Sequence, residues 1–411
     1  MRNILHCDMN NFYASVECML NPELKNYPVA VCGSVEDRHG IVLAKNYKAK
    51  SFGVQTGDAV WEAKKKCENI VIVPPHYDEY LKFSKLARSI YDRYTDLVEP
   101  FGMDECWLDI TGSTSLFGDA NKIAEDIRAA TKRELGLTIS IGVSFNKVFS
   151  KLGSDMKKPD AITEIPYDNF KEKIWGLPAS DMIGVGRATA KKLKSRCIYT
   201  IGDLANYDPV SLKYMLGING VKLWRFANGF DNSPVMPNEY KAPIKSIGHG
   251  ITCVEDLTQN SDVFKVILEM TQNISKKLKS NSLLATGIGV TVRDNRLHSK
   301  NYSRKMRYAS HSVKEIAEEA YKLFEEKHIW FCDIRSITVT ALNLIPDSIP
   351  QQLDLFGDEE QREKNEKIEN AISDIRSRFG QESITYACLL GNNKMPKNKS
   401  VDITMPTGVF A

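Results

Sequence analysis

The sequence predicts a multidomain α+β protein, and three observations support this fold class. The chain has 411 residues, 42% of them hydrophobic and 26% charged, which is typical of a folded chain with about two to four domains. Helix and strand periodicities alternate up to about residue 165, and a lysine-rich helical region follows. Beyond a segment rich in Pro and Asn at residues 230–243, strand-like and helix-like stretches alternate again.

An acidic pair interrupts an apolar stretch in the segment PFGMDECWLDI, residues 100–110. Flanking residues such as Met103 and Trp107 predict a strand, and a Thr-Gly-Ser turn ends it. Because neighbouring strand residues point to opposite faces, Asp104 and Glu105 cannot share one solvated face of a regular strand. The pair fits either a solvated strand edge or a site at the end of the strand.

A second acidic position, near the N-terminus, favours the interpretation that the acidic pair belongs to a site at the end of the strand. The N-terminal stretch RNILHCDMNNFYASVE reads as a strand that stops near Asp8 and is followed by a helix. If this strand lies beside the strand that carries Asp104, the carboxylates converge. Carboxylate oxygens are the ligands that Mg²⁺ prefers, and a pair of such ions stabilises the attacking and leaving oxygens of a phosphoryl displacement.

Charge and cysteine content narrow the class of protein. The net charge is only +3, but residues 187–196 and 296–307 each carry five Lys or Arg and no acid. Such stretches are either solvated faces or phosphate-binding surfaces. The sequence has no membrane-length apolar stretch and no visible secretory signal. Its nine cysteines lack a CxxC pair, which predicts reduced thiols in a cytoplasmic protein rather than zinc ligands or disulfides.

The segment LPASDMIGVGRATAKKL, residues 177–193, reads as a helix, a glycine turn and a second helix. Gly184 and Gly186 allow a turn with open backbone amides, and Arg187 and Lys191 lie in the helix that follows. Amides at a helix N-terminus bind phosphate, and basic side chains add charge. The pattern resembles the helix-hairpin-helix, a nucleic-acid backbone clamp; a purely structural turn is the alternative.

The C-terminal half predicts an α+β module and a tail. Strand-like alternation occurs at residues 244–253, 283–295 and 334–345, and amphipathic helices are predicted at 262–280 and 312–327. From residue 346 the chain becomes polar, and a helix is predicted over residues 359–379.

Taken together, these segments resemble the Y-family translesion DNA polymerases, closest to the bacterial DNA polymerase IV type. The likeness covers nearly the whole chain and is carried in order by CDMNNFYASVE, VAVCG, GIVLAKNYKAKSFGV, VEPFGMDECWLDI, IGVSFNKVFSKLGSDMKKPDAI and IGVGRATAKKL. It implies a right-hand polymerase with palm, fingers, helix-hairpin-helix thumb and α+β little finger. The implied function is template-directed, low-fidelity addition of dNTPs to a primer end, with bypass of damaged template bases.

The resemblance also implies domain boundaries. They are residues 1–13 and 77–165 for the palm, 14–76 for the fingers, 166–232 for the thumb, 233–241 for a linker, 242–345 for the little finger and 346–411 for a C-terminal tail.

Site residues follow from the same resemblance. Asp8, Asp104 and Glu105 would be catalytic and, with the carbonyl of Met9, would hold two Mg²⁺ ions, for which Mn²⁺ can substitute. The nucleotide would be contacted by Tyr47, Lys50 and Lys158 at its triphosphate, by Tyr13 as a steric gate against ribonucleotides, and by Ile41 and Leu43 over the nascent base pair. Primer-template DNA would be contacted by Gly184, Gly186, Arg187, Lys191, Arg304, Lys305 and Arg307.

Some positions depart from the family pattern. Lys50 stands where many members have Arg, so a compact ammonium group replaces a planar guanidinium group that can donate two parallel hydrogen bonds. Gly102 stands where many members have Ser. Ile41 and Leu43 are larger than the alanines that some members have there, which implies a different lesion preference.

The tail contains an apolar patch in the polar segment QQLDLFGD. Gln352, Leu353, Leu355 and Phe356 resemble the peptide by which bacterial polymerases bind the ring-shaped sliding clamp. The alternative is that these side chains fold back onto the little finger. The expected partners are therefore primer-template DNA, dNTPs and the clamp, with no membrane, and the expected state is a monomer.

Two other functions share part of this pattern. A nucleotide cyclase also builds a two-metal site on a palm-like sheet, but it needs neither a helix-hairpin-helix nor a basic α+β module. A non-catalytic DNA-binding protein could retain the fold, but it would be expected to lose a carboxylate, and Asp8, Asp104 and Glu105 are all present.

Overall fold

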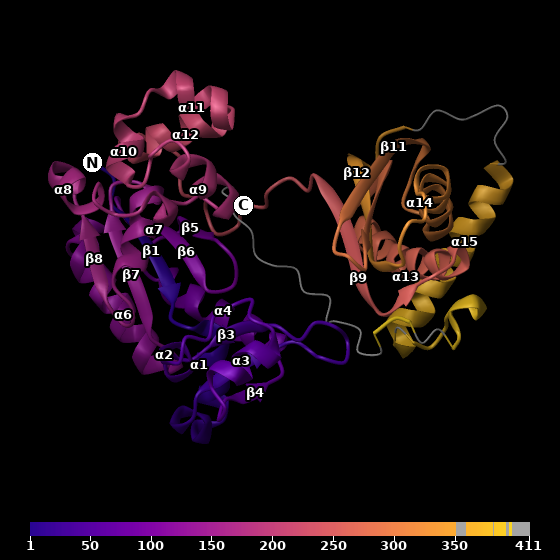
Figure 1. Ribbon diagram of the computed structural model, residues 1–411, viewed down its shortest axis with the longest axis horizontal. Helices are drawn as coiled ribbons and strands as arrows, with labels where there is room; N and C mark the ends of the chain where they lie inside the picture. The colour runs from indigo at the N-terminus through magenta and orange to yellow at the C-terminus, as the bar shows by residue number, and fades with distance from the viewer. Residues whose placement is uncertain (351–358, 381, 392–393, 397–411) are drawn as a thin grey trace. The chain divides into compact units, whose positions relative to one another are not determined.

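The computed structural model describes residues 1–350, 359–380, 382–391 and 394–396. These residues form two compact units (Figure 1). The first comprises residues 1–33 and 41–242, and the second comprises residues 34–40 and the described residues from 243 onward. No helix in the described ranges is long and apolar enough to span a membrane. The peptide predicted at residues 352–356 lies outside the described residues.

The first unit is built on a five-stranded sheet, here called the palm sheet, with the strand order β5-β6-β1-β7-β8. All six residues of the central strand β1 are buried, because β6 and β7 flank it and helices cover the sheet. Leu5 and Cys7 point into the core beneath two helices, whereas His6 and Asp8 point to the opposite face. The elements are β1 (Ile4–Met9), α4 (Tyr77–Tyr91), β5 (Val98–Pro100), β6 (Glu105–Asp109), α5 (Thr114–Phe117), α6 (Ala120–Leu135), β7 (Ile139–Ser144), α7 (Lys147–Met156) and β8 (Ile162–Ile165).

Helix α7 lies directly on the second face of the palm sheet, and a glycine permits this close approach. A Cβ atom built on Gly142 of β7 would lie 1.8 Å from the carbonyl oxygen of Ser150 and 2.5 Å from the amide nitrogen of Ser154. On the helix side, a Cβ at Gly153 would lie 3.2 Å from the Cα of Gly142. No other residue type fits at position 142 without moving the helix backbone.

A three-stranded sheet in the order β3-β2-β4 forms within the segment predicted as fingers. Its core is small and includes Ala30, Val42 and Val54. The elements of this segment are α1 (Phe12–Leu20), η1 (Pro22–Asn26), β2 (Val29–Cys32), β3 (Val42–Lys45), α2 (Tyr47–Ser51), α3 (Val60–Lys66) and β4 (Val71–Val73).

The segment predicted as thumb consists of short helices. They are η2 (Tyr167–Asn169), α8 (Phe170–Ile174), η3 (Ala179–Asp181), α9 (Arg187–Lys194), α10 (Ile201–Asn206), α11 (Pro209–Leu216) and α12 (Ile218–Ala227). The predicted helix before the glycine turn is reduced to the 3-10 helix η3. Pro178 before it and Gly184, with a φ of 90°, after it leave too few residues for a full α-helix.

The second unit contains a four-stranded sheet in the order β11-β10-β12-β9. Its elements are β9 (Ser246–Leu257), α13 (Asn260–Ser280), β10 (Leu283–Asp294), β11 (Ser299–Ser310), α14 (Val313–Lys327) and β12 (Ile334–Pro346). The predicted strands and both amphipathic helices of this module are confirmed. Strand β11 was not predicted within the basic segment, because an edge strand rich in Lys, Arg and Ser shows little hydrophobic alternation.

The predicted C-terminal helix is confirmed as α15 (Glu359–Phe379), and it packs on the second unit. The carboxylate of Glu369 accepts a hydrogen bond from Ser312 Oγ at 2.7 Å and lies 3.5 Å from Lys279 Nζ. Further on, the 3-10 helix η4 (Ala387–Leu389) adds Leu389 to the hydrophobic core. The described part of the tail is therefore integral to this unit.

The segment predicted as a linker is docked on the palm over its first half. The amide of Met236 donates to Glu99 Oε2 at 3.0 Å, and the amide of Asn238 donates to the carbonyl oxygen of Asp96 at 3.1 Å. Val235 is buried in a small cluster with Trp107. Residues 233–238 therefore belong to the first unit.

The variant Gly142→Ala is expected to lower the free energy of unfolding by about 1–3 kcal/mol or more, because the new methyl group overlaps the backbone of α7. Gly112→Ala is the matched control, since nothing lies within 4 Å of its Cβ position, and its effect should stay within about 0.5 kcal/mol. Urea unfolding followed by tryptophan fluorescence measures both. Equal stability of the two variants would contradict the close approach.

Candidate active site

Two adjacent strands bring the predicted carboxylates to one end of the palm sheet. Strands β1 and β6 are antiparallel, and Asp8 lies opposite Glu105 in their register. The amide of Met9 donates to the carbonyl oxygen of Asp104 at 3.0 Å, which ties the residue before β6 to the end of β1. The sequence analysis expected these acids to converge if the two strands lie side by side, and the two strands are neighbours in the sheet.

Asp8 is buried, Asp104 and Glu105 are half-buried, and the three carboxylates are close enough to repel one another. Burial raises the pKa of Asp104 to about 7, and the charges of Asp8 and Glu105 add to this effect. Burial likewise raises the pKa of Asp8 to about 6. Ionising such a group becomes easier when positive charge approaches. The arrangement therefore favours a bound cation.

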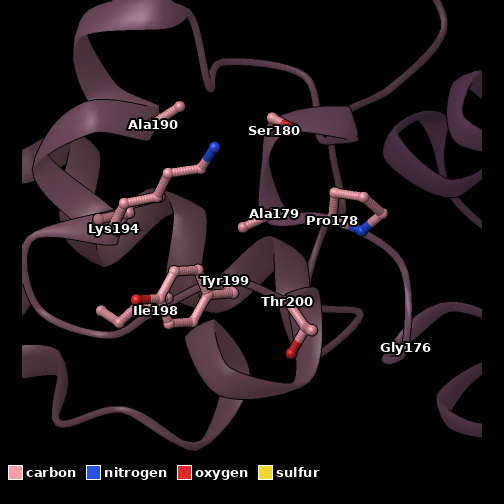
Figure 2. A pocket seen from close by; sticks show the side chains of 10 residues that line it. Gly176, Pro178, Ala179, Ser180, Ala190, Lys194, Ile198, Tyr199 and Thr200 are labelled. Atoms are coloured by element: carbon pink, nitrogen blue, oxygen red, sulfur yellow. The ribbon is translucent and has the colours of Figure 1, made fainter.

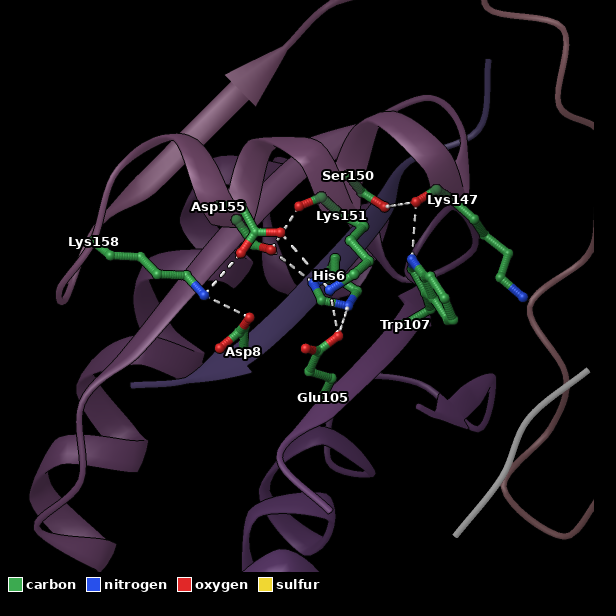
Figure 3. A network of polar contacts seen from close by, with 10 residues as sticks. His6, Asp8, Glu105, Trp107, Lys147, Ser150, Lys151, Asp155 and Lys158 are labelled. Carbon is green, nitrogen blue, oxygen red and sulfur yellow. Dashed lines mark hydrogen bonds and ion pairs between the residues drawn. The ribbon is translucent and has the colours of Figure 1, made fainter. Parts of the chain in front are cut away.

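Two lysines supply positive charge at this site (Figure 3). Lys158 Nζ lies 2.7 Å from Asp8 Oδ2, and Lys151 of α7 forms an ion pair with Glu105. Burial acts to raise the pKa of Glu105, but His6 and Lys151 outweigh burial and lower this pKa to about 2. Glu105 is therefore an ionised carboxylate at neutral pH.

The donor set fits a hard divalent cation. The carboxylates of Asp8, Asp104 and Glu105 and the carbonyl of Met9 offer only oxygen ligands, which Mg²⁺ and similar ions prefer. Within the described residues no three or more His, Cys, Asp or Glu side chains are gathered as a formed metal site. Instead, the ammonium groups of two lysines lie against the carboxylates of Glu105 and Asp8 and balance their negative charge.

Of the residues predicted to contact the triphosphate, Lys158 lies in this site, where it pairs with Asp8. Burial raises the pKa of the Tyr47 hydroxyl, and the charges of Lys158 and Asp8 act on it more weakly. Lys50 is exposed on α2, and its ammonium group lies 5.7 Å from the centre of the Tyr47 ring. Helix α2 begins at Tyr47 because the Asn46 side chain caps it by accepting from the Ala49 amide.

The predicted gate residue Tyr13 is fixed by aromatic contacts. Its ring stacks on Tyr80, with centroids 4.3 Å apart and an interplanar angle of 10°. The Tyr80 hydroxyl in turn donates to the buried carboxylate of Glu17. The Tyr13 hydroxyl donates to Met103 Sδ at 3.6 Å, beside Asp104 in the chain, and burial raises the pKa of Tyr13 to about 12. The ring therefore lies beside the acidic site in a fixed orientation.

The two residues predicted to cover the base pair lie at the start of β3. Ile41 is 45% exposed, and Leu43 is half-buried. Between them, Val42 points into the core of the smaller sheet, so strand alternation directs its two neighbours away from that core.

The predicted DNA contacts of the thumb are accessible. Gly184, Gly186, Arg187 and Lys191 are all exposed, and Gly186 is the N-cap residue of α9. A hollow of about 290 Å³ also lies in this segment, between η3, α9 and residues 198–200 (Figure 2). It is lined by residues such as Ala179, Ile198 and Tyr199 and contains none of the predicted site residues.

The basic segment of β11 divides between two faces of its sheet. Lys305 and Arg307 are exposed on one side. Arg304 points to the other side, where its guanidinium lies 3.0 Å from Glu326 and 3.2 Å from Glu319 of α14. Because adjacent strand residues alternate in direction, the three basic residues do not form one surface. Arg304 is engaged in ion pairs within the second unit.

One face of the four-stranded sheet is lined by small residues that the sequence analysis did not single out. A Cβ at Gly250 of β9 would lie 2.3 Å from Thr338 Oγ1, and a Cβ at Gly248 would lie 3.0 Å from Thr340 Oγ1. The opposite face carries apolar residues such as Ile247 and packs into the core. The glycine-threonine face is therefore low in relief.

The sequence analysis also missed polar residues that hold the site. Asn10 accepts from the amide of Asp160 at 2.9 Å and donates to Ser140 Oγ at 2.9 Å, which anchors the loop that carries Lys158. Lys151 is a second omission. Charged residues at positions 147, 151 and 155 recur every four residues on one face of α7, and this spacing could have identified it.

Comparison with known proteins assigns the family. Residues 7–155 match the model of the impB/mucB/samB family, and residues 244–355 match the C-terminal domain of that family. The chain is 49% identical over 389 residues to the DNA polymerase IV of Acetivibrio thermocellus, covering 95% of this chain and 98% of that relative. The chain belongs to this family. It is also 36% identical over 390 residues to DNA polymerase IV 1 of Bacillus subtilis, covering 95% of this chain and 93% of that relative.

A solved structure agrees in fold. The Y-family DNA polymerase chimera Dbh-Dpo4(243-245)-Dbh superposes with a TM-score of 0.72 at 23% identity, covering 84% of this chain and 99% of the chimera. The predicted membership in the Y-family, of the DNA polymerase IV type, is confirmed, and with it the right-hand fold and DNA-directed DNA polymerase activity. Enzymes of this family require divalent metal ions, in agreement with the donor set at Asp8, Asp104 and Glu105.

Proposed function

We propose that this polymerase carries out low-fidelity, template-directed DNA synthesis past damaged template bases, by a two-Mg²⁺ mechanism at Asp8, Asp104 and Glu105. The observation that supports it most is the cluster of buried and half-buried carboxylates at the ends of β1 and β6, which lysine ammonium groups face. Its substrates are primer-template DNA and dNTPs, and Mn²⁺ is expected to replace Mg²⁺. We place the enzyme in the cytoplasm as a monomer. Primer extension on intact and damaged templates is the direct test.

Positioning and charge neutralisation account for most of the proposed catalysis. The cations, when bound, stabilise charge on the attacking and leaving oxygens. The protein's own residues then orient the nucleotide. Lys158, whose ammonium group already lies in the site, would pair with the triphosphate, and the nearby Tyr47 hydroxyl would donate a hydrogen bond to it. Exposed Ile41 and half-buried Leu43 would form the roof above the new base pair and influence which lesions are accepted.

Replacing Asp8 or Asp104 by Ala is expected to reduce dNTP incorporation by roughly a thousandfold or more, because several kcal/mol of charge stabilisation are lost. Primer extension measures this loss, and DNA binding should be unaffected because its contacts lie elsewhere. Asp126→Ala is the matched control, since Asp126 lies on α6 and forms its ion pair with Lys122, one turn away on the same helix. Near-normal extension by either active-site variant would refute the assignment.

The variant Tyr13→Ala is expected to admit ribonucleotides, because removing the ring that stacks on Tyr80 opens space beneath the sugar. Discrimination between dNTP and rNTP, measured as the ratio of their kcat/KM values, should fall by at least about tenfold, or about 1.4 kcal/mol. Tyr27→Ala, at a tyrosine that is 53% exposed, is the control. Unchanged discrimination would place the gate at another residue.

The DNA grip is proposed to combine the glycine turn before α9 with the glycine-threonine face and its neighbours Lys305 and Arg307. Neutralising Lys305 and Arg307 together should reduce the slope of log Kd against log salt by about two, one for each lost phosphate contact. Arg304→Ala should leave this slope unchanged, because Arg304 is paired with Glu319 and Glu326. Measuring DNA affinity at several salt concentrations gives the slope for each variant. If only Arg304→Ala changes the slope, the DNA contact lies on the face of the sheet that carries Arg304.

We also propose that Gln352, Leu353, Leu355 and Phe356 bind the sliding clamp. Tethering to the clamp would raise the effective concentration of the enzyme at the primer end. The double variant Leu355→Ala with Phe356→Ala is expected to lose clamp-stimulated synthesis and to keep clamp-independent synthesis. Full stimulation of the double variant would place the contact elsewhere.

A further inference from the structure

An exposed tryptophan lies in the first turn of helix α3, and the proposed chemistry does not use it. Trp61 is 67% exposed, whereas the other four tryptophans of the chain are buried or half-buried. Helix α3 buries Val60 and Ala63 in the core of the three-stranded sheet, so Trp61 points away from that core. A single exposed apolar side chain is common, so the surroundings of Trp61 decide what it can do.

Helix α3 begins beside the proposed roof residue Ile41, at the start of strand β3 (Figure 1). The backbones of Ile41 and Ala59 form an antiparallel bridge, and the amide of Val42 donates to the carbonyl oxygen of Asp58 at 2.8 Å. Two steps of about 3.8 Å between consecutive Cα atoms place the Cα of Trp61 within about 8 Å of that of Ala59. The exposed indole therefore belongs to the surface next to the roof.

The exposed side of helix α3 is basic. Lys64 and Lys65 follow Trp61 by three and four residues, so they lie on its side of the helix, and both are exposed. The nearest carboxylate in the sequence, that of Glu62, accepts a hydrogen bond from the amide of Ala59 at 2.9 Å. An exposed aromatic ring with ammonium groups one turn away suits single-stranded nucleic acid, because bases stack on the ring and phosphates pair with the cations.

We propose that Trp61 stacks on an unpaired base of the template strand ahead of the new base pair, with Lys64 and Lys65 against the phosphates of that strand. The inference rests on the proposed function, which places the new base pair under Ile41. A template that is copied one base at a time passes the roof unpaired, so its next bases come within reach of the indole. Every base has a flat aromatic face, so this contact is independent of sequence. Trp61 is then a positioning residue for the template.

The test varies the number of unpaired template bases. The full-length enzyme is titrated, without nucleotide, against labelled primer-template DNA that has either one or eight unpaired template bases, and fluorescence anisotropy gives each Kd. The unmodified enzyme is expected to bind the longer overhang about tenfold more tightly, as for one base stacked on an aromatic ring. Trp61→Ala should remove most of this gain without changing the Kd for the one-base DNA, whereas Trp61→Phe should retain most of it.

A double variant, Lys64→Ala with Lys65→Ala, tests the phosphate contacts. It should reduce the slope of log Kd against log salt by about 1.4 for the longer overhang, because each phosphate contact on a single strand contributes about 0.7. The slope for the one-base DNA should not change. Tyr27→Ala is the matched control, since this 53% exposed ring precedes strand β2, whose other end pairs with Val42. Its gain from the longer overhang should equal that of the unmodified enzyme.

Two results would overturn the role of Trp61. One is the same ratio of the two Kd values in Trp61→Ala and in the unmodified enzyme, which would leave the indole as a contact for another protein. The other is an equal loss of affinity for both DNAs, which would mean that the ring supports the fold. Ile41→Ala tests the roof separately, because opening it should raise incorporation opposite a bulky template adduct on the one-base DNA. Unchanged incorporation refutes the roof, whereas raised incorporation with an unchanged Kd ratio in Trp61→Ala refutes only the inference about Trp61.

Discussion

The contact between helix α7 and the palm sheet at Gly142 is the constraint on which the active site depends. Because the helix backbone touches the sheet with no side chain between them, one helix can reach both acidic strands. Lys151 reaches Glu105 on β6, and Ser154 reaches His6 on β1. A wider spacing would break both contacts together. The close packing at Gly142 therefore determines which charged and polar side chains reach the carboxylates.

Two ion pairs, one on helix α7 and one on the loop that follows it, differ in how accessible they are. Lys147 and Glu99 lie 2.6 Å apart and are almost completely buried, so separating them would leave an unpaired charge in the core. By contrast, the side chain of Lys158 is 26% exposed where it pairs with Asp8. A partly exposed pair can exchange partners at modest cost, since water can solvate the separated charges. The buried pair is therefore fixed in place, and the partly exposed pair is suited to ligand exchange.

The second unit shows how strand alternation divides one basic segment into two roles. Arg304 points toward α14 and binds its acids, whereas Lys305 and Arg307 remain on the exposed side. The glycine-threonine face of the sheet stays open because α13 and α14 pack on the opposite face. Helix α15 extends the covered side through contacts such as that of Glu369 with Ser312. This unit therefore presents a flat face with basic residues at one edge.

The sequence by itself determined the features that depend on neighbours a few residues away. Hydrophobic periodicity was enough to predict α13, α14 and α15, and the ends of apolar stretches marked Asp8 and the acidic pair. The direction of Arg304, the docking of residues 233–238 and the contact of His6 with Ser154 depended on the tertiary structure. His6 and Ser154 are 148 positions apart, and nothing local indicates that they meet. Periodicity reports which face of an element is buried, whereas the identity of the buried partner is decided only when distant elements pack.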